Sequence, residues 1–171
     1  MSTLTVRPLA AHDLPAVQAI YGHHVLHGLA SFEEEPPSLE EMHARWKKVR
    51  ESGLPYLAAE LDGAVVGYSY AGPYRPRAAY RYTVENSVYV RDGLAGRGVG
   101  QALLVELIAR CEAGPWRQML AVIGNRANQA SIALHRRCGF RMIGVLEAVG
   151  RKHGQWVDTV LMQRAIGKPE P

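Results

Sequence analysis

Cysteine is scarce in this chain of 171 residues, which contains only two. Cys111 and Cys138 do not have the CxxC or metal-ligand spacing that would indicate a zinc site. We therefore interpret both thiols as core or surface side chains and not as nucleophiles. A chain of this length buries enough surface to fold without a disulfide or a structural metal, and a reducing cytoplasm is the expected compartment.

Long apolar runs and clustered charge are also missing. No apolar run approaches the length of a membrane span, and residues 1–10 lack the charged and apolar regions of a signal peptide, so no membrane partner is expected. The net charge is +4 and the isoelectric point about 9.2. Basic residues gather only in short pairs such as Lys47–Lys48, so no nucleic-acid partner is expected. The mild positive charge does suit an anionic ligand.

The pattern of apolar residues and turns predicts one domain, residues 1–166, followed by a short tail, residues 167–171. Strands and helices alternate irregularly, which favours an α/β fold with a mixed sheet and helices on its faces over a doubly wound sheet. Asp62–Gly63 predicts a hairpin turn, Asp13 a cap before the first helix, and Ser38 a capping box. The predicted strands are 3–8, 56–61, 64–71, 86–90, 119–123, 141–149 and 156–163. Four helices are predicted. One begins at residue 14, one begins at residue 38, and two span 98–113 and 129–138.

A glycine-rich stretch lies between a predicted strand and a predicted helix, where phosphate-binding loops commonly occur. It is not a P-loop, because Val99 stands where the lysine of that motif belongs. It is not a dinucleotide-binding motif either, because Gln101 and Leu103 occupy positions that require glycine.

What remains is residues 96–101 at the start of a helix. Glycines at 96, 98 and 100 let the backbone approach a diphosphate closely, the first N–H groups of the helix are unpaired, and Arg97 adds a positive charge. From the glycines alone, both a diphosphate site and an ordinary strand–helix turn stay open.

The histidines at positions 23, 24 and 27 include one pair, His23 and His27, with the i, i+4 spacing that can hold a metal on a helix. There is no HExxH motif and no obvious third ligand. No metal site is expected.

The stretch from Ser87 to Leu104, with glycines at 98 and 100, resembles the acetyl-CoA motif of the GNAT superfamily of N-acetyltransferases. A later stretch, from Asn128 to Phe140 and ending in Gly–Phe, resembles a second motif of that family. The chain departs from the family pattern at Ala95, where arginine or glutamine is usual. The resemblance implies the GNAT fold, with a splayed strand pair and acetyl-CoA as cosubstrate. The residues it implies for cofactor binding are Val88, Tyr89, Val90, Gly96, Arg97, Gly98, Val99, Gly100, Gln101, Asn128 and Ser131.

Three further segments resemble one subgroup, the phosphinothricin and methionine sulfoximine/sulfone N-acetyltransferases. They are AGPYRPRAAY with YTVE after it (71–85), KHGQWVD (152–158) and ASFE (30–33). The resemblance implies transfer of an acetyl group to the α-amine of a small amino-acid-like acceptor, in an enzyme that forms a homodimer near Trp156. The residues it implies for the acceptor are Phe32, Tyr74, Arg75, Arg77, Tyr80 and Glu85.

The chemistry of the reaction asks for a base, because an α-amine is largely protonated at neutral pH. Glu85 lies just before the predicted strand 86–90, and the family's general base falls on this position; the alternative is a solvated carboxylate at a strand end. His135 is the second catalytic candidate, against a packing role. A backbone N–H within residues 88–90 is the expected oxyanion donor. The arginines at 75 and 77 suit an acceptor carboxylate, against an interpretation as solvated loop residues.

Two rival functions remain open from the sequence. The first is a GNAT enzyme for an aminoglycoside, a polyamine or a protein N-terminus, acceptors of which the cationic ones favour an acidic pocket. The arginine-rich loop argues against those cationic acceptors, whereas the run Glu33–Glu35 complicates that argument unless it is solvated. The second rival is a coenzyme A binding module without catalysis, and measured turnover separates it from an enzyme.

Overall fold

Seven strands form a single sheet in the order β1-β2-β3-β4-β5-β7-β6 in a computed structural model that describes residues 2–168. The strands are β1 (Leu4–Pro8), β2 (Tyr56–Leu61), β3 (Ala64–Pro73), β4 (Thr83–Val90), β5 (Gln118–Gly124), β6 (Arg141–Lys152) and β7 (Gln155–Ala165). The helices are α1 (Leu14–His27), α2 (Leu39–Glu51), α3 (Val99–Glu112) and α4 (Gln129–Arg137), with short 3₁₀ turns η1 (Ala11–Asp13) and η2 (Ala78–Tyr80). Of the predicted tail, residues 169–171 lie outside the described range.

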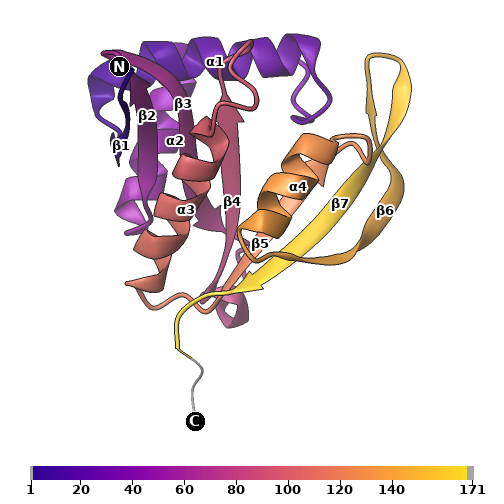
Figure 1. Ribbon diagram of the computed structural model, residues 1–171. Coiled ribbons are helices and arrows are strands. Elements are labelled where there is room, and N and C mark those ends of the chain that lie inside the picture. Colours follow the sequence, from indigo (N-terminus) through magenta and orange to yellow (C-terminus); the bar gives the residue numbers. More distant parts are fainter. Residues whose placement is uncertain (1, 169–171) are drawn as a thin grey trace.

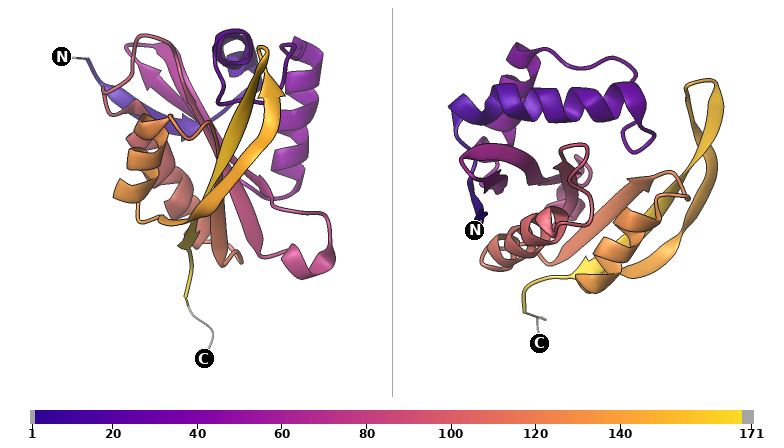
Figure 2. Two further views of the ribbon diagram at one scale, coloured as in Figure 1. Left: turned by 90° about the vertical axis from the view of Figure 1, so that its right-hand side faces the viewer. Right: turned by 45° about the horizontal axis from the view of Figure 1, so that its top comes forward.

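The sheet is mixed, and helices cover both of its faces. Every neighbouring pair is antiparallel except β4 and β5, which run parallel and are joined through α3. Figure 2 shows α1 and α2 on one face of the sheet and α3 and α4 on the other. The prediction of a mixed α/β fold is therefore confirmed. No helix in the part of the chain described here has the length and apolar character needed to cross a membrane.

Local sequence signals explain several element boundaries. Asp62 and Gly63 have φ values of 50° and 82°, the left-handed pair that a two-residue hairpin turn requires. Ser38 accepts a hydrogen bond from the backbone N–H of Glu41 at 3.1 Å, as predicted, but the Glu41 carboxylate that would complete the capping box binds Arg45 instead. The prediction for Asp13 was wrong in its partner: the carboxylate does not cap α1. It accepts from Arg7 at 2.7 Å and from the N–H of Ala10 at 2.8 Å, because the charged contact with the partly exposed guanidinium outcompetes the helix end for this buried carboxylate.

The core lies on both faces of the sheet, against α1 and α2 on one side and against α3 on the other. Val99, Leu103 and Leu107 are at most 2% exposed, as their four-residue spacing predicts. Gly67 on β3 permits this close packing, since an added Cβ there would lie 3.0 Å from Leu103 Cδ1. Helix α3 is thereby fixed against the sheet, and so is its N-terminus.

Strands β4 and β5 diverge halfway along their length. Their parallel pairing runs from Thr83 to Asn86 on β4 and stops there, while β5 continues to Gly124 beside β7. Figure 1 shows the β5–β7–β6 part leaning away from β1–β4 above this point. We call this divergence the fork. It confirms the predicted splayed pair.

Candidate active site

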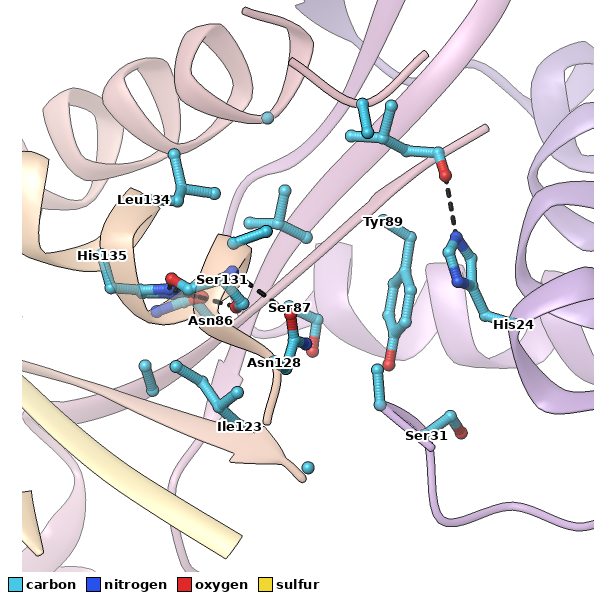
Figure 3. A pocket seen from close by; sticks show the side chains of 18 of the residues that line it. His24, Ser31, Asn86, Ser87, Tyr89, Ile123, Asn128, Ser131, Leu134 and His135 are labelled. Carbon is cyan, nitrogen blue, oxygen red and sulfur yellow. Dashed lines mark hydrogen bonds between the residues drawn. The ribbon is translucent and has the colours of Figure 1, made fainter. Parts of the chain in front are cut away.

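The fork exposes the backbone of β4. The N–H of Arg91 donates to the carbonyl of Val66, and the N–H of Tyr74 donates to the carbonyl of Thr83. The backbone groups of the odd-numbered residues of β4 therefore form hydrogen bonds with β3. The backbone groups of Val88 and Val90 therefore point the other way, into the fork, where the described part of β5 no longer pairs with them. The carbonyl of Val90 accepts a hydrogen bond from His24 Nε2 at 2.8 Å (Figure 3). N–H groups along this edge can serve as donors to a developing oxyanion, and this role stays a prediction.

The glycine loop follows directly and ends at α3. Gly96 and Gly98 have φ values of 77° and 81°, and an added Cβ at either position would meet nothing within 4 Å. Gly98 is the N-cap residue of α3, where no side chain caps the helix. The first N–H groups of α3 thus face open space beside a positive helix end, which suits a diphosphate.

A cavity of about 1050 Å³ occupies the fork. It extends from the glycine loop and α4 on one side to the α1–α2 connection on the other, and it is large enough for a ligand of coenzyme size. Of the predicted residues it is lined by Phe32, Glu85, Val88, Tyr89, Val90, Gly96, Gly98, Val99, Gly100, Gln101, Asn128, Ser131 and His135. Arg97 is exposed and lies outside this lining.

Glu85 lines the cavity and forms no ion pair among residues 2–168, whereas Glu33 pairs with Arg45 and Asp92 lies 3.6 Å from His23 Nε2. It lies within β4 and not before it, because β4 begins at Thr83; pairing with β3 on one side and β5 on the other extends the strand beyond the predicted start. Side chains alternate along a strand, so Glu85 shares its face with Tyr89, which packs on Tyr21 of α1. Burial raises the pKa of the Glu85 carboxyl.

His135 faces the cavity from α4, on the opposite face of β4 from Glu85. Its Nδ1 donates to the carbonyl of Ser131 at 2.7 Å, and its Nε2 lies 3.1 Å from Asn86 Oδ1 (Figure 3). Asn86 in turn donates to the carbonyl of Leu120 at 3.2 Å, at the point where β4 and β5 separate. The ring is 4% exposed, and burial lowers the pKa of the imidazole.

Two polar residues at the start of α4 also line the cavity. Asn128 is the N-cap residue, and its Oδ1 accepts from the backbone N–H of Ser131 at 3.2 Å. The cap uses only the oxygen of this amide, so its nitrogen stays available to a ligand in the fork. The cofactor-binding role that the family resemblance implies for the two residues stays a prediction.

The arginines of the β3–β4 connection lie elsewhere within one chain. Arg75 and Arg77 line a separate hollow together with Trp116, and neither borders the main cavity. The tyrosines predicted with them, Tyr74 and Tyr80, pack edge to face with ring centroids 5.4 Å apart and do not border it either. The connection leaves the sheet at the end opposite the glycine loop (Figure 1). Contact between these four side chains and an acceptor therefore stays a prediction.

The sequence analysis missed several cavity residues on the α1–α2 side. Sequence reasoning assigned Tyr21 no role in the site and left open whether the run Glu33–Glu35 is solvated. The structure instead brings Glu33 to the cavity wall, where it pairs with Arg45. Ser87 and His24 also line the cavity. No local pattern identifies such residues, since their partners lie on other elements; only the position of Glu33 directly after Phe32 was available as a signal.

Residues 20–140 match the family described as "Acetyltransferase (GNAT) family", and the chain belongs to it. With the fork and the glycine loop described above, this match defines the protein as an N-acetyltransferase of the GNAT fold.

Relatives with known names narrow the class. The chain is 58% identical over 162 residues to a phosphinothricin N-acetyltransferase of Alcaligenes faecalis, covering 95% of this chain and 82% of that protein. It is 41% identical over 160 residues to the L-methionine sulfoximine/L-methionine sulfone acetyltransferase of Pseudomonas aeruginosa, covering 93% and 92%. A crystal structure of a phosphinothricin acetyltransferase from Sinorhizobium meliloti in complex with AcCoA superimposes with a TM-score of 0.94 at 46% identity, covering 98% and 94%.

Proposed function

We propose that this enzyme transfers the acetyl group of acetyl-CoA to the α-amine of small amino-acid-like acceptors such as phosphinothricin or methionine sulfoximine and sulfone. The names of its relatives support this acceptor class. The observation that carries the chemistry is Glu85, a desolvated carboxylate on the cavity wall beside the fork.

The coenzyme side of the cavity fits acetyl-CoA. The open φ-positive glycines at 96 and 98 leave room for the diphosphate, and the unpaired edge of Val88 to Val90 faces the fork where the pantetheine arm would run. Acetyl-CoA supplies the activated acyl group. The residues of this chain bind and orient it through backbone N–H groups, which is why Ala95 in place of an arginine or glutamine is compatible with binding.

Glu85 acts as the general base. An ammonium acceptor must lose a proton before its nitrogen can attack, and a carboxyl whose pKa is raised by burial accepts that proton more readily than a solvated one. The N–H groups of the β4 edge provide the donors for the negative oxygen that forms. His135 supports the fork instead of taking the proton, because its Nδ1 donates to the carbonyl of Ser131 and its ring lies across β4 from Glu85.

Transfer is direct, without an acetylated enzyme. Burial raises the pKa of the Cys111 thiol to about 12, so this thiol stays protonated at neutral pH, and the Cys138 thiol also has a raised pKa. Neither cysteine lines the cavity. Incubation with acetyl-CoA in the absence of an amine should leave the protein mass unchanged; an added acetyl group on a cysteine would contradict direct transfer.

A homodimer completes the proposal. The β6–β7 hairpin exposes a group of large apolar side chains, an arrangement that favours pairing with a second copy. They are Met142, Ile143, Val145, Leu146, Val149 and Trp156, each at least 36% exposed. Trp156 alone is 66% exposed.

The acceptor class is tested by thiol release from acetyl-CoA with phosphinothricin, methionine sulfoximine, methionine sulfone, spermidine and an N-terminal peptide side by side. Turnover with the first three alone is expected. Turnover only with spermidine or the peptide would keep the fold and cosubstrate but contradict the acceptor, and acetyl-CoA binding without turnover would indicate a binding module.

A further inference from the structure

The connection between α1 and α2 supplies one wall of the cavity. Ala30, Ser31, Phe32 and Glu33 line it, and they belong to no helix or strand. We call these four residues the acceptor wall, since they lie on the Glu85 face of β4 and away from the glycine loop. A segment without ladder hydrogen bonds owes its position to the side chains that hold it.

Helices α1 and α2 hold the wall from one side. The hydroxyl of Tyr21 lies 2.8 Å from Ser31 Oγ and also donates to the Glu33 carboxylate. Arg45 on α2 donates from both terminal nitrogens to the same carboxylate, Nη1 at 2.9 Å and Nη2 at 2.6 Å. A two-pronged contact of this kind fixes the orientation of a carboxylate as well as its position. It also neutralises Glu33, which lowers the pKa of that carboxyl.

The β6–β7 hairpin holds the wall from the other side. Lys152, which is 2% exposed, donates from Nζ to the carbonyl of Ser31 at 2.6 Å. Gly150 provides the space for the Phe32 ring, since an added Cβ would lie 2.4 Å from Phe32 Cε2. The acceptor wall therefore lies between the α1–α2 pair and the tip of the β6–β7 hairpin, which lie close together in Figure 2.

We infer that Arg45 is a positioning residue for the acceptor: through Glu33 it sets the place of the acceptor wall, and with it the position of Phe32 over the acceptor. The inference rests on the proposed function for where the acceptor binds. Arg45 itself does not line the cavity. Its guanidinium also donates to Glu41, on its own helix, at 2.8 Å, and Glu41 does not line the cavity either.

The test compares steady-state kinetics of Arg45→Gln and Glu33→Gln with those of Glu41→Gln. The first two should raise the acceptor KM about fivefold, the effect of losing a partly exposed ion pair, and leave kcat and the acetyl-CoA dissociation constant within about twofold. Glu41→Gln is the matched control, since it removes the other carboxylate bound by the same guanidinium; its acceptor KM should stay at the wild-type value.

A double variant tests the pair itself. Glu33→Arg with Arg45→Asp reverses the charges and should bring the acceptor KM back to within about twofold of wild type. Equal effects of Arg45→Gln and Glu41→Gln, or an equal rise in the KM for acetyl-CoA, would overturn the inference. If the wild type acetylates another amine of the panel in place of phosphinothricin, the proposed acceptor fails, and the same variants are measured with that amine.

Discussion

Gly98 allows the cost of backbone strain to be separated from the cost of lost coenzyme binding. It has a φ of 81° and lines the cavity at the start of α3. Gly53, after α2, has a φ of 74° and lines neither of the two hollows described above. An added Cβ at either position would meet nothing within 4 Å. Gly98→Ala and Gly53→Ala therefore cause the same backbone strain. Only the methyl group at position 98 lies in the proposed coenzyme site.

The expected stability losses are equal. Holding alanine in the left-handed region costs about 1–2 kcal/mol, which lowers the melting temperature of a chain of this size by about 2–8 °C. Only Gly98→Ala places a methyl group where the diphosphate should approach the helix N-terminus. Losing one charge-assisted hydrogen bond there weakens acetyl-CoA binding about tenfold or more.

The assays are thermal unfolding of both variants without ligand and calorimetric titration with acetyl-CoA. Gly53→Ala should melt lower but bind acetyl-CoA as tightly as the wild type does. Gly98→Ala should melt lower by a similar amount and bind more weakly. If both variants bind acetyl-CoA equally well, the glycine loop does not cradle the diphosphate and the reasoning is refuted.

Three other predictions concern the base, the fork and the hairpin. Because burial raises the pKa of Glu85, kcat/KM should fall with decreasing pH through a pKa above the ordinary value of about 4.3; an acidic limb at or below that value would contradict a desolvated base. The folded state then binds more protons than the unfolded state between the two pKa values, so this group makes stability fall as pH rises through that window, and Glu85→Gln should remove the trend from thermal unfolding scans. Asn86→Ala removes the amide that donates to the carbonyl of Leu120 where β4 and β5 separate and should cost about 1–3 kcal/mol in urea unfolding, whereas an unchanged midpoint would show that the contact stabilises nothing. Trp156→Glu should convert dimer to monomer in sedimentation velocity, and a wild type that sediments as a monomer would refute the dimer.

The sequence predicted the elements well where local chemistry decides them. The hairpin turn at Asp62–Gly63, the Ser38 cap and the buried stripe of α3 depend on neighbours within a few residues, so their patterns are visible in the chain. Strand β4 was predicted three residues too short. Residues 83–85 pair with the end of β3 on one side and with β5, more than thirty residues away, on the other, and no local pattern records these pairings.

Some residues of the candidate site can likewise be predicted from local sequence, whereas others become visible only in the fold. The glycine loop and Glu85 were predicted because motif resemblance marks them along the chain. The contact between Glu33 and Arg45 was not, since a loop carboxylate and a helix guanidinium twelve residues apart resemble solvated surface charges until the fold brings them together. The arginines at 75 and 77 were placed from resemblance alone, and the β3–β4 connection carries them away from the cavity of their own chain.

The central claim is that Glu85 takes the proton from the acceptor amine, and the most direct measurement is kcat/KM of Glu85→Gln beside its acetyl-CoA dissociation constant. Glutamine keeps the size of the side chain but cannot accept the proton. Glu85→Gln should lower kcat/KM about 10²–10⁴-fold and leave acetyl-CoA binding within about twofold of wild type. Turnover close to the wild-type value would contradict the role of Glu85 as base, and loss of acetyl-CoA binding would show that its role is structural.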